Sequence, residues 1–166
     1  TAMENGQIAY AGKYSAPDYE TILAANCGLA IENTMIYHTP EVKEQLEKYK
    51  LTPVSIIPDH FGRPIWGLGA FTHPDPDVRQ AAVKETMDMV EAARFIGCDT
   101  ISIWNGQDGY DYPLQANYAD ASKWLVEGLR ECALAAPDIR FSLEYKPKEP
   151  RNHSFISNVW SAITYA

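Results

Sequence analysis

The sequence has little positive charge and no long apolar run, and both absences exclude classes of protein. It carries 14 Lys and Arg against 22 Asp and Glu, a net charge of -8. Binding to phosphates needs clustered basic side chains, so we expect no nucleic-acid partner. No apolar run approaches the roughly 20 residues that span a bilayer, so we expect no membrane partner. No signal-peptide pattern is visible at the N-terminus, and we expect a cytoplasmic protein.

Cysteine is scarce, and the common nucleotide and hydrolase motifs are missing. The three cysteines are widely spaced, and none lies near a histidine at zinc-site spacing, so we expect reduced, mostly buried thiols at Cys27, Cys98 and Cys132. No strand is followed by a Gly-x-Gly-x-x-Gly or Gly-x-x-x-x-Gly-Lys sequence, and no Gly-x-Ser-x-Gly occurs. Neither nucleotide binding at a first turn nor a serine-hydrolase elbow is therefore indicated.

The composition that remains is that of one globular domain. Hydrophobic residues make up 46% of the 166 residues, so we expect a single domain over 1–166. Helical spacing and end signals predict helices at 17–25, 40–50, 75–95, 118–135 and 155–165. Apolar and β-branched runs predict strands at 8–14, 29–38, 54–57, 100–104 and 140–146. Strands that alternate with helices predict an α/β fold with a parallel sheet.

Polar residues gather just after the predicted strands. These polar residues lie at 59–60, 105–111 and 144–151. The long loop 58–74 also has a length that is usually associated with function. In an α/β barrel the ends of the strands form the catalytic face. Glu144 and Lys146 share one face of the last strand, because side chains alternate along a strand. Charge there is costly unless a metal or substrate accounts for it; the alternative is an ordinary charge pair.

Three segments, taken in order, carry a resemblance to a known family: Ala70-Phe-Thr-His-Pro74, Ile103-Trp-Asn-Gly-Gln-Asp-Gly109 and Leu143-Glu-Tyr-Lys-Pro-Lys-Glu-Pro-Arg151. They resemble the xylose isomerase-like TIM barrels, the sugar isomerases and epimerases. The second segment is similar to the family's Trp-Gly-Gly-x-Glu-Gly loop. The third is similar to Glu-Pro-Lys-Pro-x-Glu-Pro-Arg of xylose isomerases, and its opening Leu-Glu-Tyr-Lys resembles that of rhamnose isomerases. The resemblance implies a (β/α)8 TIM barrel of which this chain covers about five of the eight βα units.

The same resemblance implies a metal-dependent sugar isomerase that interconverts an aldose and a ketose by a C1–C2 hydride shift. The implied cofactor is a divalent metal (Mn²⁺, Mg²⁺ or Co²⁺), and the substrate is a monosaccharide. Glu144 matches a metal ligand, and Lys146 matches the catalytic lysine that holds the substrate's C1 oxygen. Trp104 and Phe71 match aromatic residues that line the sugar site, although both positions are equally compatible with a core role.

The histidines leave a choice open. His38-Thr-Pro-Glu41 has the spacing of the family's His-x-x-Asp, with Glu replacing Asp, which makes His38 a candidate for opening the sugar ring. Glu41 also fits as an acid in the first turn of a helix. His60 competes for the same role, although we expect it to be a solvated loop histidine.

Two other functions remain open. A ketose 3-epimerase uses two carboxylates as acid and base, whereas Lys146 two residues beyond Glu144 favours the isomerase. A non-catalytic partial barrel would act through a partner chain. In every case the missing strands would leave an open sheet edge, so we expect a homo-oligomer or association with the missing part of the barrel.

Overall fold

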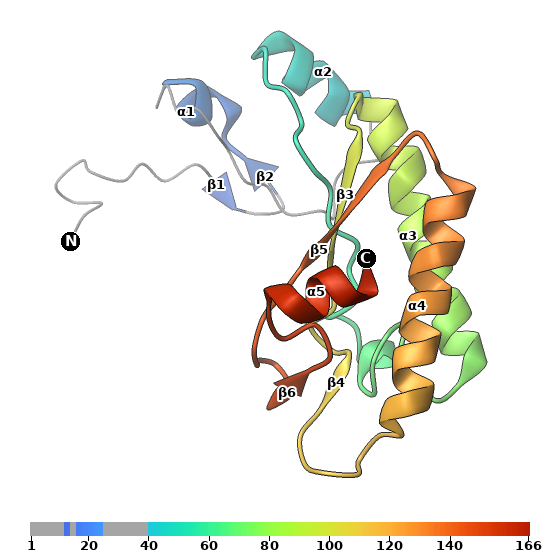
Figure 1. The fold of residues 1–166 in the computed structure, drawn as a ribbon. Coiled ribbons are helices and arrows are strands. Elements are labelled where there is room, and N and C mark those ends of the chain that lie inside the picture. Colours follow the sequence, from blue (N-terminus) through green and yellow to red (C-terminus); the bar gives the residue numbers. More distant parts are fainter. Residues whose placement is uncertain (1–11, 14–15, 25–39) are drawn as a thin grey trace, which may run out of the picture.

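The protein is described by a computed structural model that covers residues 12–13, 16–24 and 40–166 (Figure 1). At its centre, strands β3 (Thr100–Trp104) and β5 (Arg140–Glu144) pair in parallel. Ile56 joins the other side of β3: its N–H donates to the Thr100 carbonyl at 3.1 Å, and its carbonyl accepts the Ser102 N–H at 2.8 Å. Three parallel segments therefore lie side by side, and each is followed by a helix.

Helices α3 and α4 pack against each other beside the parallel strands (Figure 1). Helix α3 begins after Asp75, whose side chain accepts the Asp77 N–H, and it ends at Gly97 in the left-handed conformation that glycine favours (φ 78°). Helix α5 is attached to α4 through the hydroxyl groups of Ser122 and Tyr165, 2.9 Å apart. The helices are α1 (Tyr19–Ala24), α2 (Pro40–Lys48), α3 (Pro76–Ile96), α4 (Tyr118–Ala135) and α5 (Val159–Tyr165), with a short 3-10 helix at Pro64–Trp66.

The core lies between the parallel strands and the two long helices. The buried side chains of β3 alternate with half-exposed ones, as expected for a strand that is covered on one face. Gly128 lets the loop before α3 approach α4, because a Cβ at this position would overlap the ring of Phe71. Fully buried core residues include Ile56, Phe71, Val90, Ile101, Ile103 and Leu125. Cys98 and Cys132 are buried free thiols, as predicted, whereas Cys27 lies outside the described residues.

Several predicted elements need correction. The expected strand at 54–57 is reduced to the single bridge of Ile56. The described part of the expected strand at 8–14 is β1 (Gly12–Lys13), which pairs antiparallel with β2 (Ala16–Pro17) and starts no βα unit. The expected strand at 29–38 lies outside the described residues. Local β-propensity cannot decide between a parallel strand and a short ribbon, because pairing depends on distant partners.

A second antiparallel ribbon connects two loops that the sequence analysis treated separately. Strand β4 (Gly109–Tyr110) pairs with β6 (His153–Ser154), and a Cβ at position 109 would overlap the His153 carbonyl. The last helix begins at Val159, not near residue 155, because the Asn158 side chain caps it. Among the residues that the structure describes, no helix is long and apolar enough to cross a membrane.

Candidate active site

Three loops meet at the carboxyl ends of the parallel strands. The loop 58–74 follows Ile56, the loop 105–117 follows β3, and the segment 145–158 follows β5. The register of the sheet places Trp104, the last residue of β3, opposite Glu144, the last residue of β5. The polar residues that follow the strands in the sequence are therefore brought to one edge, as the sequence analysis expected.

Lys146 lies against the ring of Trp104. Its Nζ is 5.1 Å from the centre of the indole ring and 3.2 Å from Oε2 of Glu149. The side chains of Lys146 and Glu149 are 38% and 78% exposed, and an ion pair this exposed contributes at most about 1 kcal/mol. Lys146 therefore pairs with Glu149 and not with Glu144, and this pair is weak enough to be exchanged for a ligand. The Lys146 ammonium remains accessible beside an aromatic surface.

Glu144 presents a carboxylate at the same edge. Glu144 is exposed, and within the described part of the chain its side chain makes no hydrogen bond or ion pair. Carboxylate oxygens suit hard divalent cations, so Glu144 fits as one ligand of such an ion. The described residues contain no group of three or more His, Cys, Asp or Glu side chains that could hold a metal by themselves. Glu144 therefore accounts for one position of a metal site and not for a complete one.

The ring of Phe61 packs against the ring of Trp104. Their ring centres are 4.6 Å apart, at an angle of 56°. Gly106 also lies close to the Trp104 ring, because a Cβ at this position would be only 2.8 Å from two of its ring atoms. Sequence reasoning missed Phe61; the only available signal was an aromatic residue directly after Asp59-His60 in the long loop.

The other predicted aromatic, Phe71, lies in the core. Its side chain has no exposed surface, and it packs against His60 and the backbone of Gly128. Of the two roles that the sequence left open for Phe71, the structure shows core packing. Trp104, in contrast, is half-exposed at the strand edge.

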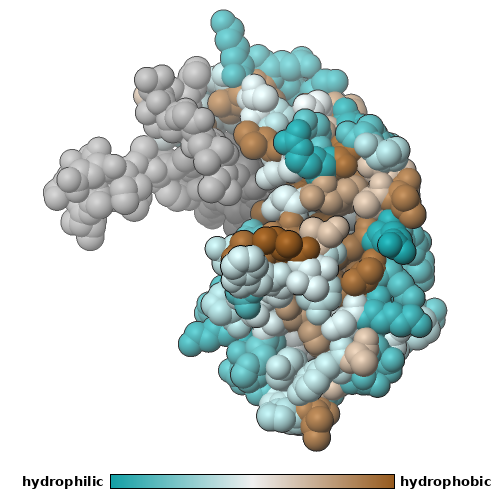
Figure 2. All heavy atoms as spheres, viewed as in Figure 1, coloured by the Kyte–Doolittle hydropathy of each residue, from teal (hydrophilic) through white to brown (hydrophobic). Residues whose placement is uncertain are grey.

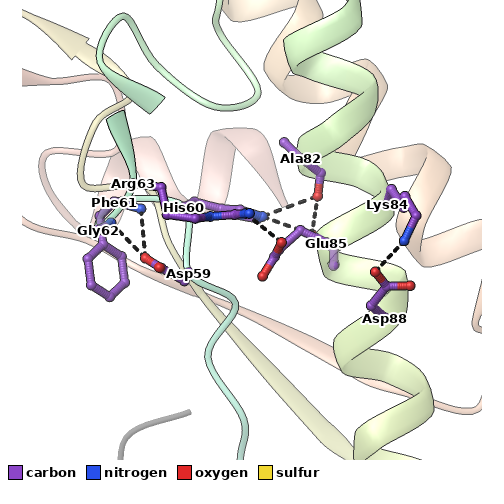
Figure 3. A network of polar contacts seen from close by, with 10 residues as sticks. Asp59, His60, Phe61, Gly62, Arg63, Ala82, Lys84, Glu85 and Asp88 are labelled. Carbon is purple, nitrogen blue, oxygen red and sulfur yellow. Dashed lines mark hydrogen bonds and ion pairs between the residues drawn. The ribbon is translucent and has the colours of Figure 1, made fainter. Parts of the chain in front are cut away.

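The expectation that His60 is solvated was wrong. Its ring is fully buried between Trp66 and Phe71, with ring centres 5.7 and 5.0 Å away. Nε2 lies 3.2 Å from the Ala82 carbonyl, an acceptor only, so this nitrogen carries the proton and donates to it (Figure 3). Burial lowers the pKa of His60 to about 4, although the negative charge of Asp108 and the Ala82 carbonyl act in the opposite direction.

Asp108 joins two of the three loops from inside. Its carboxylate is fully buried, and Oδ1 accepts the N–H groups of Ala70 and Thr72 at 2.8 Å and the Thr72 hydroxyl at 2.6 Å. Oδ2 accepts the Asn105 amide at 2.7 Å. A buried carboxylate needs such donors, so this network holds the loop after β3 against the loop before α3. In the sequence, Asp108 is one member of the polar stretch 105–111, and no local pattern singles it out.

Arg151 joins the third loop to the other two. Its Nη1 lies 2.8 Å from Oδ2 of Asp111, and its Nη2 donates to the Gly67 carbonyl. The Asn152 N–H also donates to Asp111. The backbone donor of Asn152, followed by Arg151, lowers the pKa of the Asp111 carboxyl group. These contacts link the segment after β5 to the loops that contain Asp111 and Gly67.

The remaining histidine candidate, His38, lies outside the described residues. Glu41, its partner in the sequence pattern, is exposed in the first turn of α2. This is the helix-start position that the sequence analysis weighed against a catalytic role.

Parallel strands followed by helices, with polar loops at the carboxyl ends of the strands, define an α/β protein. Residues 21–164 match the xylose isomerase-like TIM barrel family, and the chain belongs to this family. The predicted fold class is thereby confirmed. Because the described residues hold three parallel segments, the structure represents only part of such a barrel.

Individual relatives support the same family. The chain is 28% identical over 127 residues to a xylose isomerase of Thermus thermophilus, covering 74% of this chain and 33% of that protein. It is 27% identical over 125 residues to a xylose isomerase of Thermus caldophilus, covering 73% and 32%. The crystal structure of a D-tagatose 3-epimerase-like protein superposes with a TM-score of 0.53 at 20% identity, over 68% of this chain and 41% of that one. The chain therefore spans about a third of the length of the curated relatives it matches.

Proposed function

We propose that the chain is the N-terminal part of a divalent-metal-dependent sugar isomerase, which interconverts an aldose and a ketose by moving a hydride between C1 and C2. The observation that carries this proposal is the meeting of Lys146, Trp104 and Glu144 at the carboxyl edge of β3 and β5. An ammonium, an aromatic surface and a carboxylate are the groups that such a reaction needs at one place. The xylose isomerases among the relatives support the same reaction class.

Lys146 would hold the sugar's C1 oxygen. A fixed positive charge near an oxygen that gains negative charge stabilises the transition state more than the ground state. The neighbouring indole of Trp104 would restrict water around the ammonium and strengthen this interaction. Since the contact with Glu149 is weak and exposed, a sugar oxygen would replace it at little cost.

Glu144 would supply one carboxylate to the metal. A divalent ion bound there would polarise the sugar's oxygens as a Lewis acid. The unpaired and exposed carboxylate fits this role, and the ion's further ligands would lie outside the described residues. Glu144 and Lys146 therefore have separate tasks, the first in binding the ion and the second in placing the sugar.

The experiment that tests the proposal is Lys146→Met in the complete enzyme that carries this chain. The substitution keeps much of the stem and removes the charge. We expect kcat for the preferred aldose to fall by roughly 10²-fold or more, with metal affinity retained, because Lys146 is not a ligand. Lys148→Met is the matched control, since this lysine is exposed and two residues further on. Turnover of Lys146→Met close to the wild-type rate would remove the main support for the isomerase.

Running the reaction in D₂O separates the two enzyme activities. A hydride shift moves hydrogen within the sugar, so the product should gain no deuterium from the solvent. Epimerisation at C3 by proton removal and return would introduce deuterium at C3. The D-tagatose 3-epimerase-like relative shares the fold, which makes this comparison necessary. If the complete enzyme converts no aldose and no ketose, the remaining hypothesis is a non-catalytic partial barrel that acts through a partner chain.

A further inference from the structure

We infer that Phe61 is the second aromatic side chain that contacts the sugar, in the position that the sequence motif assigns to Phe71. The inference rests on the proposed function, because it names a binding residue of the same site. Both phenylalanines belong to the loop 58–74, so the motif and the structure disagree only on which ring faces the substrate. The contacts of the two rings decide between them.

Phe71 has no surface to offer a ligand. Its ring is fully buried, it packs edge-on against the imidazole of His60, and it fills the space above Gly128 on α4. Moving it to a substrate pocket would empty part of the core, and vacating a core phenylalanine is strongly destabilising. Phe71 is therefore fixed in a role that excludes sugar contact.

Phe61 has the opposite surroundings. Its ring is half-exposed and lies 4.6 Å from that of Trp104, whose face is also 5.1 Å from Nζ of Lys146. One aromatic pair thus stands next to the ammonium that would bind the C1 oxygen. A sugar presents C–H groups beside its hydroxyls, and binding sites of small molecules commonly combine apolar walls with a few polar groups that orient the ligand.

The backbone of Phe61 is held in place by neighbouring polar groups. Asp59 accepts the N–H groups of Phe61 and Gly62 at 3.3 and 2.6 Å (Figure 3), and the Gln107 amide donates to the Phe61 carbonyl at 3.2 Å. The last bond comes from the loop after β3, which also positions Trp104. A ring that is held by two loops meets a ligand at little further cost in conformational entropy.

The test compares Phe61→Leu with Phe61→Tyr and Phe71→Leu in the complete enzyme. Four quantities are measured: the affinity for the preferred aldose by calorimetry, kcat and KM for its conversion, and the melting temperature. We expect Phe61→Leu to weaken sugar binding and raise KM by about tenfold, with kcat within a few-fold and the melting temperature unchanged. Phe61→Tyr retains an aromatic ring and should bind the aldose as the wild type does.

Phe71→Leu should behave in the opposite manner, with a lower melting temperature and nearly wild-type affinity in the folded protein. Wild-type affinity of Phe61→Leu, or loss of affinity in Phe71→Leu without a change in melting temperature, would overturn the inference. If the wild type binds an aldose without converting it, the isomerase proposal fails, but the comparison of binding affinities still decides the role of Phe61. A wild type that binds no sugar would overturn both.

Discussion

The buried imidazole of His60 makes the stability of the protein depend on pH. Its pKa is lowered to about 4 in the folded state, against an ordinary value of 6.5 in the unfolded chain. Between these values the unfolded state binds more protons, so stability should fall as the pH decreases from about 6.5 to about 4. The loss amounts to about 3 kcal/mol, and urea unfolding at a series of pH values would measure it.

Substitution of His60 isolates this effect. His60→Gln lowers stability at neutral pH but should flatten the pH dependence, because the titrating group is gone. His153→Gln is the matched control, since that side chain is exposed on β6, and it should retain the wild-type slope. Equal slopes for the wild type and His60→Gln would show that other groups control the response to acid.

Glu144 supports a second prediction at the residue scale. Glu144→Gln preserves the shape of the side chain and removes its charge. If Glu144 binds the metal, calorimetric titration of the complete enzyme with Mn²⁺ should show at least a roughly tenfold loss of affinity, because hard cations prefer charged oxygen ligands. Glu131→Gln, an exposed position on α4, is the control and should not change the affinity. Unchanged Mn²⁺ binding in Glu144→Gln would remove Glu144 from the ligand set.

At the scale of elements, the contact between α4 and the loop before α3 depends on Gly128. Alanine would favour the helix by up to about 1 kcal/mol, but its Cβ would overlap the buried ring of Phe71. Overpacking a closed core costs about 1 to 3 kcal/mol, so we expect Gly128→Ala to lower the free energy of unfolding by about 1 kcal/mol or more. Chemical denaturation would measure the change.

Phe71, whose ring the added methyl group would overlap, provides the control. In the background of Phe71→Leu, the smaller side chain leaves room for the added methyl group. Gly128→Ala should then cost less than in the wild type, and the two substitutions should be non-additive. Strict additivity would mean that α4 tolerates alanine at this position by moving away from the loop.

At the scale of the whole molecule, the described surface leaves large apolar side chains open to water. Figure 2 shows apolar residues lying among hydrophilic ones on one face. Among the described residues, the exposed large apolar side chains include Trp160 (75% exposed) and Ile163 (62%) on α5 and Tyr145 (52%) beyond β5. In the described sheet, β5 pairs only with β3. An open strand edge and exposed apolar side chains both favour association.

We therefore expect the 166-residue chain by itself to associate. Sedimentation at increasing protein concentration should show a rising average mass. Replacing Trp160 and Ile163 together by serine should reduce this rise, because both side chains are exposed and neither supports the core. A monomer at all concentrations, with one sharp cooperative unfolding transition, would contradict the prediction.

The sequence by itself determined the long helices and the residues at the strand ends. Local signals were sufficient for α3, because the cap of Asp75 and the stop at Gly97 depend only on neighbours in the chain. The motif that contains Glu144 and Lys146 is likewise contiguous, and strand geometry places both side chains at one end of β5. The roles of these two side chains stay predictions.

Only the tertiary structure decided which side chains of the loop 58–74 are buried. His60 and Phe71 looked like members of a polar loop and a ligand-contact motif, yet both belong to the core, while Phe61 reaches Trp104. Burial in this loop depends on α4 and on the buried carboxylate of Asp108, which lie far away along the chain. Side-chain burial is a property of contacts between distant segments, and no local pattern of residues contains that information.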